Sequence, residues 1–240
     1  PGGKTMKILS GVLLLSLMLA ETTLGGIQKR IVGVNTCSPT ERRYHVENPS
    51  KQLEKVCGSS LITNKWLLTA ARCWPDGPEW KMYAEVGGHP GPVKLQVEIK
   101  QKMIHKDKKG KTHDIMLLQL PTPVPGAVPG PGVDPINLGD CANLFSKLWG
   151  KTSKPKVFKT VQIAEPAAAN TKVLYCAELD VMKCDSSVEN SHQDIFCAQR
   201  AGVETCSGDS GAGVVYKNQL YGVFIADDEY NVWIKKTIGK

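Results

Sequence analysis

The sequence predicts an all-β fold. After residue 30 no helical periodicity runs for any length until the last dozen residues, and the chain instead contains short apolar segments separated by Gly, Pro and Asn. This pattern is typical of a β-sandwich or a pair of β-barrels, and 240 residues suffice for a sizeable core. The segments expected to be strands are Ser59–Ile62, Trp66–Thr69, Lys94–Ile99, Ile115–Leu120, Val173–Cys176, Gly213–Tyr216 and Gln219–Ile225.

The N-terminal region has the pattern of a secretory signal peptide. Lys7 precedes an apolar run from Ile8 to Ala20, which small residues follow. We therefore expect an N-terminal extension and signal peptide over residues 1–26, and a secreted, extracellular protein. The run is too short for a membrane span, and no other stretch is long and apolar enough to be one. In an exported chain the eight cysteines are expected to form disulfides rather than a metal site, and no cofactor is implied.

The charge of the chain is mildly basic. The formal net charge is +7, of which three charges come from residues 1–30, so nucleic acid is not an expected partner. The densest basic cluster, Lys106–Lys111, is expected to be a solvated loop with at most weak binding of polyanions. Residues 121–132 are rich in Pro and Gly and are typical of a connector. Near the end, Val232, Trp233, Ile234 and Ile238 predict a short terminal helix over about 231–239.

Three short motifs carry chemistry. In "CSGDSGAG" (206–213), glycines flank Ser210, as suits a nucleophile on a tight turn whose backbone N–H groups face a developing oxyanion; a plain polar turn is the alternative. In "HDIMLLQL" (113–120), Asp114 precedes an apolar strand and would orient a base or simply cap the strand. In "KRIVGV" (29–34), a dibasic pair ending at Arg30 predicts proteolytic release of an N-terminus at Ile31, or else an exposed strand start.

Taken together, these motifs resemble those of the trypsin-like (chymotrypsin-fold, peptidase S1) serine proteases. "RIVGV", "CGSSLI", "WLLTAARC", "DIMLL" and "GDSGAG" follow one another in the family's order, from Ile31 to about Ile225. The resemblance implies two packed six-stranded antiparallel β-barrels. It also implies a zymogen with a propeptide at 27–30, a first barrel over about 31–120, the connector, and a second barrel over about 133–225 within a domain spanning 31–240.

The resemblance also assigns roles to single residues. Ser210 corresponds to the nucleophile and Asp114 to the acid of the triad. Gly208 and Ser210 correspond to the oxyanion donors, Asp209 to the partner of the activated Ile31 amine, and Glu204 lies near the floor of the primary specificity pocket. Three family disulfides correspond to Cys37–Cys176, Cys57–Cys73 and Cys184–Cys197.

Two features depart from the family. Arg72 stands where the catalytic histidine is expected, and a guanidinium cannot accept the serine proton; it is expected to pair with Asp114 instead. The chain also has only six residues, 226–231, between the strand ending at Ile225 and the terminal helix. The family usually has a longer segment here, which includes a strand of the second barrel and a wall of the specificity pocket. We therefore expect both the strand and the wall to be absent. The missing segment would also leave Cys141 and Cys206 without their family partners, either free or paired with each other.

These departures favour an inactive serine protease homologue, a pseudoenzyme that binds protein or peptide ligands as a decoy for inhibitors or substrates or as a recognition module. The expected protein is a monomer that binds neither membranes nor nucleic acid. The alternative is a serine endopeptidase that prefers Lys or Arg, in which Arg72 or the short C-terminal region reflects an error in the sequence. A third hypothesis is a polyanion- or glycan-binding protein that uses Lys106–Lys111.

Overall fold

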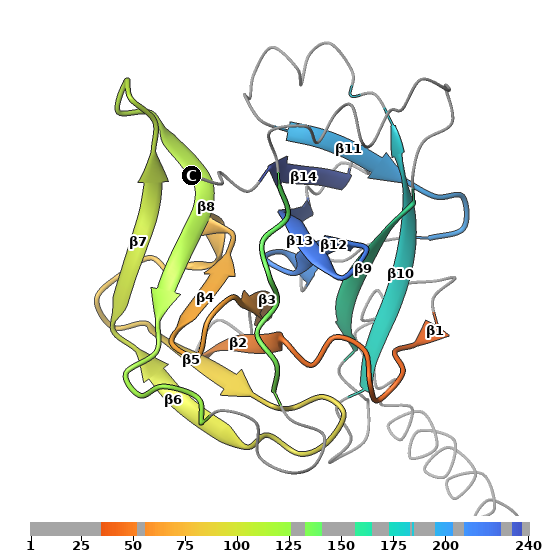
Figure 1. Cartoon of the computed structure of the whole chain (residues 1–240). Coiled ribbons are helices and arrows are strands. Elements are labelled where there is room, and N and C mark those ends of the chain that lie inside the picture. Colours follow the sequence, from red (N-terminus) through yellow and green to blue (C-terminus); the bar gives the residue numbers. More distant parts are fainter. Residues whose placement is uncertain are drawn as a thin grey trace, which may run out of the picture.

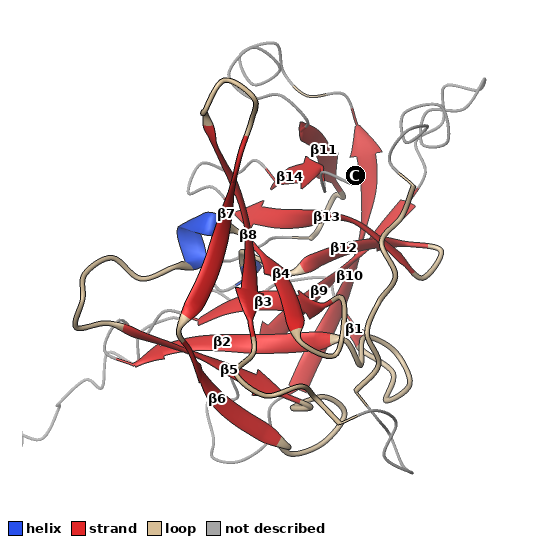
Figure 2. Ribbon diagram, turned by 60° about the vertical axis from the view of Figure 1, so that its left-hand side comes forward, coloured by secondary structure: helices blue, strands red, loops and turns tan. Residues whose placement is uncertain are grey.

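The computed structural model describes residues 35–51, 56–125, 133–140, 157–164, 173–182, 184, 195–203, 209–226 and 232–236. These residues form antiparallel sheets with very little helix (Figures 1 and 2). The strands are β1 (Asn35–Thr36), β2 (His45–Lys51), β3 (Val56–Leu61), β4 (Trp66–Thr69), β5 (Lys81–Val86), β6 (Leu95–Ile99), β7 (Gln101–Lys106), β8 (Thr112–Gln119), β9 (Val157–Ala164), β10 (Val173–Met182), β11 (Ile195–Gln199), β12 (Gly213–Tyr216), β13 (Gln219–Ala226) and β14 (Val232–Lys236).

The first sheet closes into a barrel. Its order is β6-β5-β2-β3-β4-β8-β7, and only Lys100 separates β6 from β7. The two are thus halves of one bent strand, of which the first half pairs with β5 and the second with β8. Counted in this way, six strands of the described residues close around the first core, which agrees with the predicted architecture.

The second sheet closes as well. Its order is β1-β10-β11-β14-β13-β12-β9, and an additional pairing of β9 with β10 completes the circle. Among the residues that the structure describes, six strands form this barrel, while β1 adds to the outer edge of β10. Although β1 lies within the residues predicted for the first barrel, it therefore belongs to the second sheet.

The C-terminal segment corrects two predictions. Val232–Lys236 is a strand, not part of a helix, and it pairs with both β11 and β13, so the second barrel does not lack a strand. In register, Ile234 lies opposite Phe196 on β11 and opposite Phe224 on β13. The apolar spacing suited a helix, but Val, Trp and Ile favour strands, and two neighbouring strands supply the backbone partners that decide the conformation.

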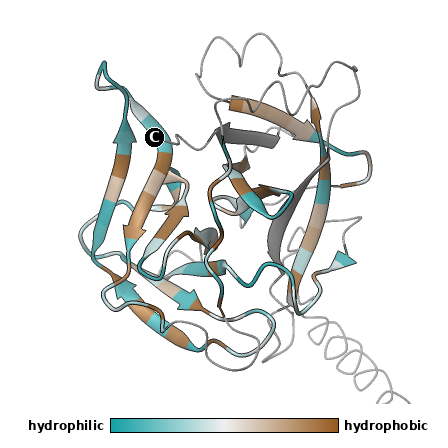
Figure 3. Ribbon diagram, viewed as in Figure 1, coloured by the Kyte–Doolittle hydropathy of each residue, from teal (hydrophilic) through white to brown (hydrophobic). Residues whose placement is uncertain are grey.

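The two cores lie on apolar strand faces. Figure 3 shows brown, hydrophobic stretches along β4 and β8, where Leu67 and Leu118 are fully buried. In the second barrel the core includes Phe196 and Phe224. All three disulfides implied by the resemblance are present, and Cys37–Cys176 joins residues 139 positions apart.

The barrels approach each other at glycines. A Cβ on Gly58 of β3 would lie 3.0 Å from the Cα of Ala212, and a Cβ on Gly213 would lie 2.2 Å from Oγ of Ser60. The backbone N–H of Gly58 donates to the carbonyl oxygen of Ser210 at 2.9 Å. This close contact places the loop that carries Ser210 against the first barrel.

Candidate active site

Position 72 is fixed by the first barrel. Arg72 lies in the short 3-10 helix η1 (Ala71–Cys73), which follows β4 directly. Cys73 anchors this turn through its disulfide to Cys57 on β3. Because β4 pairs with β8, with Thr69 opposite Met116, the start of β8 and its Asp114 lie beside the turn.

Arg72 and Asp114 form the ion pair that the sequence predicts. The backbone N–H of Arg72 donates to Oδ1 of Asp114 at 2.8 Å, and Nε of Arg72 donates to Oδ2 at 2.6 Å. The Arg72 side chain is 41% exposed and that of Asp114 is 23% exposed. Both carboxylate oxygens therefore accept hydrogen bonds from the residue at the histidine position. A guanidinium has no lone pair to accept a proton, so the partner of Asp114 in this ion pair is a group of a kind that cannot act as a base.

The loop with Ser210 is buried between the barrels. Asp209 is 3% exposed and Ser210 is 4% exposed. Gly211 has φ of 87° and donates its N–H to the carbonyl oxygen of Phe224 at 2.8 Å. A Cβ at Gly211 would lie 2.2 Å from the carbonyl oxygen of Gly58, so this turn requires glycine on grounds of both backbone conformation and space.

The Arg72 turn and the Ser210 loop are neighbours. Sγ of Cys73 lies 3.6 Å from the carbonyl oxygen of Ser210. Nearby, Oγ1 of Thr69 donates to the carbonyl oxygen of Gly58 at 2.8 Å, and Gly58 in turn binds Ser210 through its N–H. The fold thus brings Arg72, Asp114 and Ser210 into one region, although they come from η1, β8 and the segment before β12.

Other predicted site residues lie outside the described residues. These are Arg30 and Ile31 of the activation site, Glu204 of the specificity pocket, the oxyanion residue Gly208, and the two cysteines without family partners, Cys141 and Cys206. Their roles stay predictions. Within the described ranges, no group of three or more His, Cys, Asp or Glu side chains could hold a metal ion, and no helix is long and apolar enough to cross a membrane.

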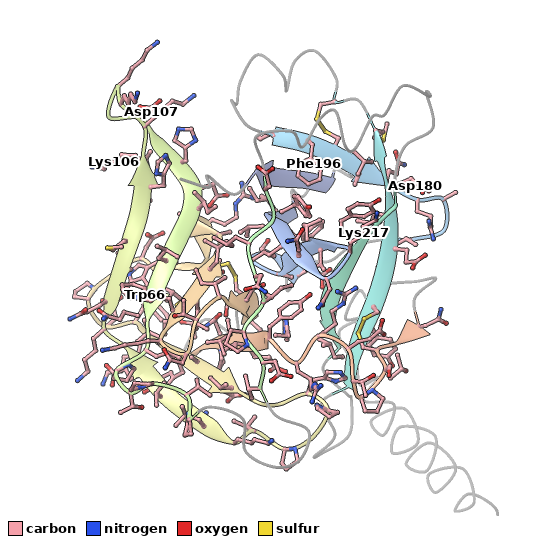
Figure 4. The ribbon with its side chains drawn as sticks, viewed as in Figure 1. Trp66, Lys106, Asp107, Asp180, Phe196 and Lys217 are labelled. Carbon is pink, nitrogen blue, oxygen red and sulfur yellow. A yellow bond between two sulfur atoms is a disulfide. The ribbon has the colours of Figure 1, made fainter. Side chains whose placement is uncertain are left out.

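The structure also shows a cluster beside the site that sequence reasoning missed. His113, next to Asp114, is 7% exposed, and its Nε2 lies 3.6 Å from Oδ2 of Asp107. Its ring centroid lies 5.1 Å from that of His105 on β7. Backbone hydrogen bonding from Lys111 is the largest cause that lowers the pKa of Asp107, which lies at the tip of the β7–β8 hairpin (Figure 4). The pairing of β7 with β8 brings His105, Asp107 and His113 together, so no local sequence pattern predicts the cluster.

Comparisons with known proteins agree with this geometry. The family model described as Trypsin matches residues 31–234. The chain belongs to the trypsin family. Thrombin-like enzyme cerastocytin of Cerastes cerastes is 27% identical over 93% of this chain and 85% of its own length. Kallikrein-8 of Rattus norvegicus is 29% identical over 77% of this chain and 78% of its own length.

A solved structure shares the fold of this trypsin-family chain. The scabies mite inactivated protease paralogue S-I1 superposes with a TM-score of 0.63 at 18% identity, over 85% of this chain and 93% of its own. At that identity the likeness concerns the fold alone. This trypsin-family chain thus has the fold of paired barrels together with three disulfides.

Proposed function

We propose that this chain is a secreted trypsin-family protein that binds protein or peptide ligands without hydrolysing them. The observation that carries the proposal is the Arg72–Asp114 pair, in which the residue at the position of the general base is a guanidinium bound to the triad carboxylate. Export is supported by the three disulfides and by the similarity to snake venom serine proteases, since such bridges persist in oxidising compartments.

The chemical argument concerns the fate of one proton. A serine nucleophile must lose its proton to a base that later returns it to the leaving amine. Arg72 can accept no proton, and its Nε is already bound to Oδ2 of Asp114. Losing one member of a triad lowers turnover by about four to six orders of magnitude, with only binding and oxyanion stabilisation left.

Ligand binding does not need the missing base. Members of the trypsin family bind protein or peptide substrates and inhibitors. In this chain the hydrogen bond between Gly58 and Ser210 still holds the loop against the first barrel. A trypsin-family protein that binds an inhibitor or a substrate without hydrolysing it withholds that ligand from an active protease, which is the decoy role that we propose.

The test combines a covalent probe with a binding measurement. The purified mature chain is treated with a fluorescent fluorophosphonate and assayed on arginine and lysine esters, beside a Ser210→Ala variant. We expect neither labelling nor turnover above that of the variant, together with a stable complex with a substrate-like protein inhibitor of trypsin-like enzymes, seen by light scattering. Turnover that disappears in Ser210→Ala would contradict the proposal, as would the absence of any complex.

A second candidate function is endopeptidase activity toward Lys or Arg bonds. It is favoured by the retention of Ser210 and of Asp114, whose Oδ1 accepts the backbone N–H of residue 72, and by relatives named as proteases. The variant Arg72→His separates the two candidates. If Arg72 is what prevents catalysis, fluorophosphonate labelling rises at least about tenfold in this variant, because general bases contribute rate factors of this size or more. Equal labelling of both proteins would show that Arg72 is not the cause.

A further inference from the structure

A cavity of about 560 Å³ lies apart from the candidate active site, where the two barrels meet. Its walls come from the turn before β2, from the segment around residues 134–137, from β10 and from the β12–β13 turn. Lys217 marks the last of these walls and lies away from the hairpin tip that carries Lys106 and Asp107 (Figure 4). Neither Arg72 nor Asp114 nor Ser210 lines this cavity.

One wall of the cavity includes Arg42, whose guanidinium is buried and has two donors without a hydrogen-bond partner. Arg42 lines the wall and is 7% exposed, so the charged side chain is more than nine-tenths buried. Its Nη1 donates to the hydroxyl oxygen of Tyr44 at 3.1 Å, but its Nε and Nη2 have no hydrogen-bond partner. A buried charged donor without a partner is costly, typically by more than about 1 kcal/mol, and it calls for an explanation.

The backbone of Arg42 is unusual too. Among the described residues, Arg42, Lys217 and Asn218 are the non-glycine residues with positive φ, at 58°, 48° and 58°, and all three line this cavity. The two-residue turn between β12 and β13 accounts for Lys217 and Asn218, because tight hairpins favour positive φ. Arg42 lies in no such hairpin, and its conformation costs an arginine about 1 kcal/mol or more.

Acidic side chains of the cavity already have other partners. Asp134 forms an ion pair with Arg43, whose Nη2 lies 3.3 Å from Oδ2, and Glu178 accepts a hydrogen bond from Nη1 of Arg200 at 3.3 Å. Glu41 accepts from the backbone N–H of Ser38 at 3.3 Å. No carboxylate of the described residues thus neutralises the free edge of Arg42 directly.

The free edge has a definite chemical preference. Nε and Nη2 are the two donors along one side of a guanidinium, and together they bind the two oxygens of a carboxylate through parallel hydrogen bonds. Burial raises the pKa of Tyr44 to about 12, so its hydroxyl stays protonated and adds a neutral donor beside Arg42. Ile136 and Val215 provide apolar wall for the aliphatic part of a ligand.

We propose that this cavity is a second binding site, which takes a carboxylate of an acidic peptide segment on the Nε–Nη2 edge of Arg42. The two donors are sealed from water in the structure, so binding requires the guanidinium to turn toward the cavity. That movement sacrifices no hydrogen bond of Nε or Nη2, since neither has one. The site is independent of the candidate active site and does not require the proposed function there.

The experiment is calorimetric titration of the mature chain with a capped pentaglutamate probe, with capped pentaglutamine and inorganic sulfate as comparisons. We expect pentaglutamate to bind and pentaglutamine not to bind. In Arg42→Gln the affinity for pentaglutamate should fall at least about tenfold, because a paired charge-assisted contact is lost. In Lys108→Gln, which removes the same charge from an exposed loop residue, it should stay within about threefold of the parent.

A second variant keeps the test decisive. If Arg42→Gln does not fold, Arg42→Lys retains the charge but not the paired donors and should still lose several-fold in affinity. Absence of pentaglutamate binding to the parent chain would overturn the proposal, as would equal binding by the Arg42 variants. Binding of sulfate without binding of pentaglutamate would overturn the assignment to a carboxylate.

Discussion

The Arg72–Asp114 pair should contribute measurably but modestly to stability. Nε and Oδ2 lie 2.6 Å apart, and the side chains are 41% and 23% exposed. For charge centres about 4 Å apart in a medium between protein surface and water, Coulomb attraction amounts to about 1–2 kcal/mol. Ordering of the side chains and solvent screening reduce this value, so we expect a net coupling of about 1 kcal/mol. The coupling free energy is measured by a double-mutant cycle that uses Arg72→Met, Asp114→Asn and the combined variant.

The assay is urea unfolding of the four proteins with intact disulfides, at low salt and at 1 M NaCl. Screening shortens the Debye length from about 10 Å at 0.1 M to about 3 Å at 1 M, so the coupling should fall by about half or more. The exposed pair Lys81–Glu98, with N and O 3.4 Å apart, serves as the matched control and should couple more weakly. A coupling below about 0.3 kcal/mol, or one that does not respond to salt, would refute the structural role assigned to Arg72.

Two further predictions concern stability. Burial is the largest cause that lowers the pKa of His45 to about 3 in the folded protein, whereas an unfolded histidine has a pKa of 6.5. Below pH 6.5 the unfolded state therefore binds more protons than the folded state, so the free energy of unfolding should fall by about 3 kcal/mol between pH 6.5 and pH 4. Urea midpoints measured across this range should show the fall, and His45→Leu should reduce it. Gly211→Ala should destabilise by about 3 kcal/mol or more, because its Cβ would meet Gly58 and Thr69 at 2.2 Å. Gly110 has a similar positive φ, but a Cβ there would meet nothing within 4 Å, so Gly110→Ala should lower the free energy of unfolding by only about 1 kcal/mol. Equal losses of stability in the thermal melts of the two variants would disprove the steric explanation.

Local sequence predicted several of the short apolar strands, although β11 was missed and β14 was expected to be a helix. The predicted segments Trp66–Thr69 and Gly213–Tyr216 coincide with β4 and β12. Segments such as β2 and β7 were missed because they contain Pro, Lys and His and do not show a clean apolar alternation. Their partners in the barrel, not their own side chains, hold them in the sheet.

The site shows the same division. The family resemblance correctly predicted the three disulfide pairings. It also predicted that Arg72 pairs with Asp114, as their opposite charges favour. Arg42 could not be anticipated as a binding residue, since its two unused donors depend on what the fold places around it. The sequence offers no local sign of positive φ at that arginine.

The sequence by itself determined which chemical groups are available: an all-β chain that resembles the trypsin family and has an arginine at position 72. Side-chain chemistry is local, so the sequence alone shows that the side chain at position 72 has no lone pair to accept a proton. Only the tertiary structure decided that β14 completes the second barrel, that β6 and β7 close the first, and that Arg42 lines a cavity with two donors unused. The physical reason is that backbone pairing and burial depend on segments far apart in the chain, which no single stretch of sequence contains.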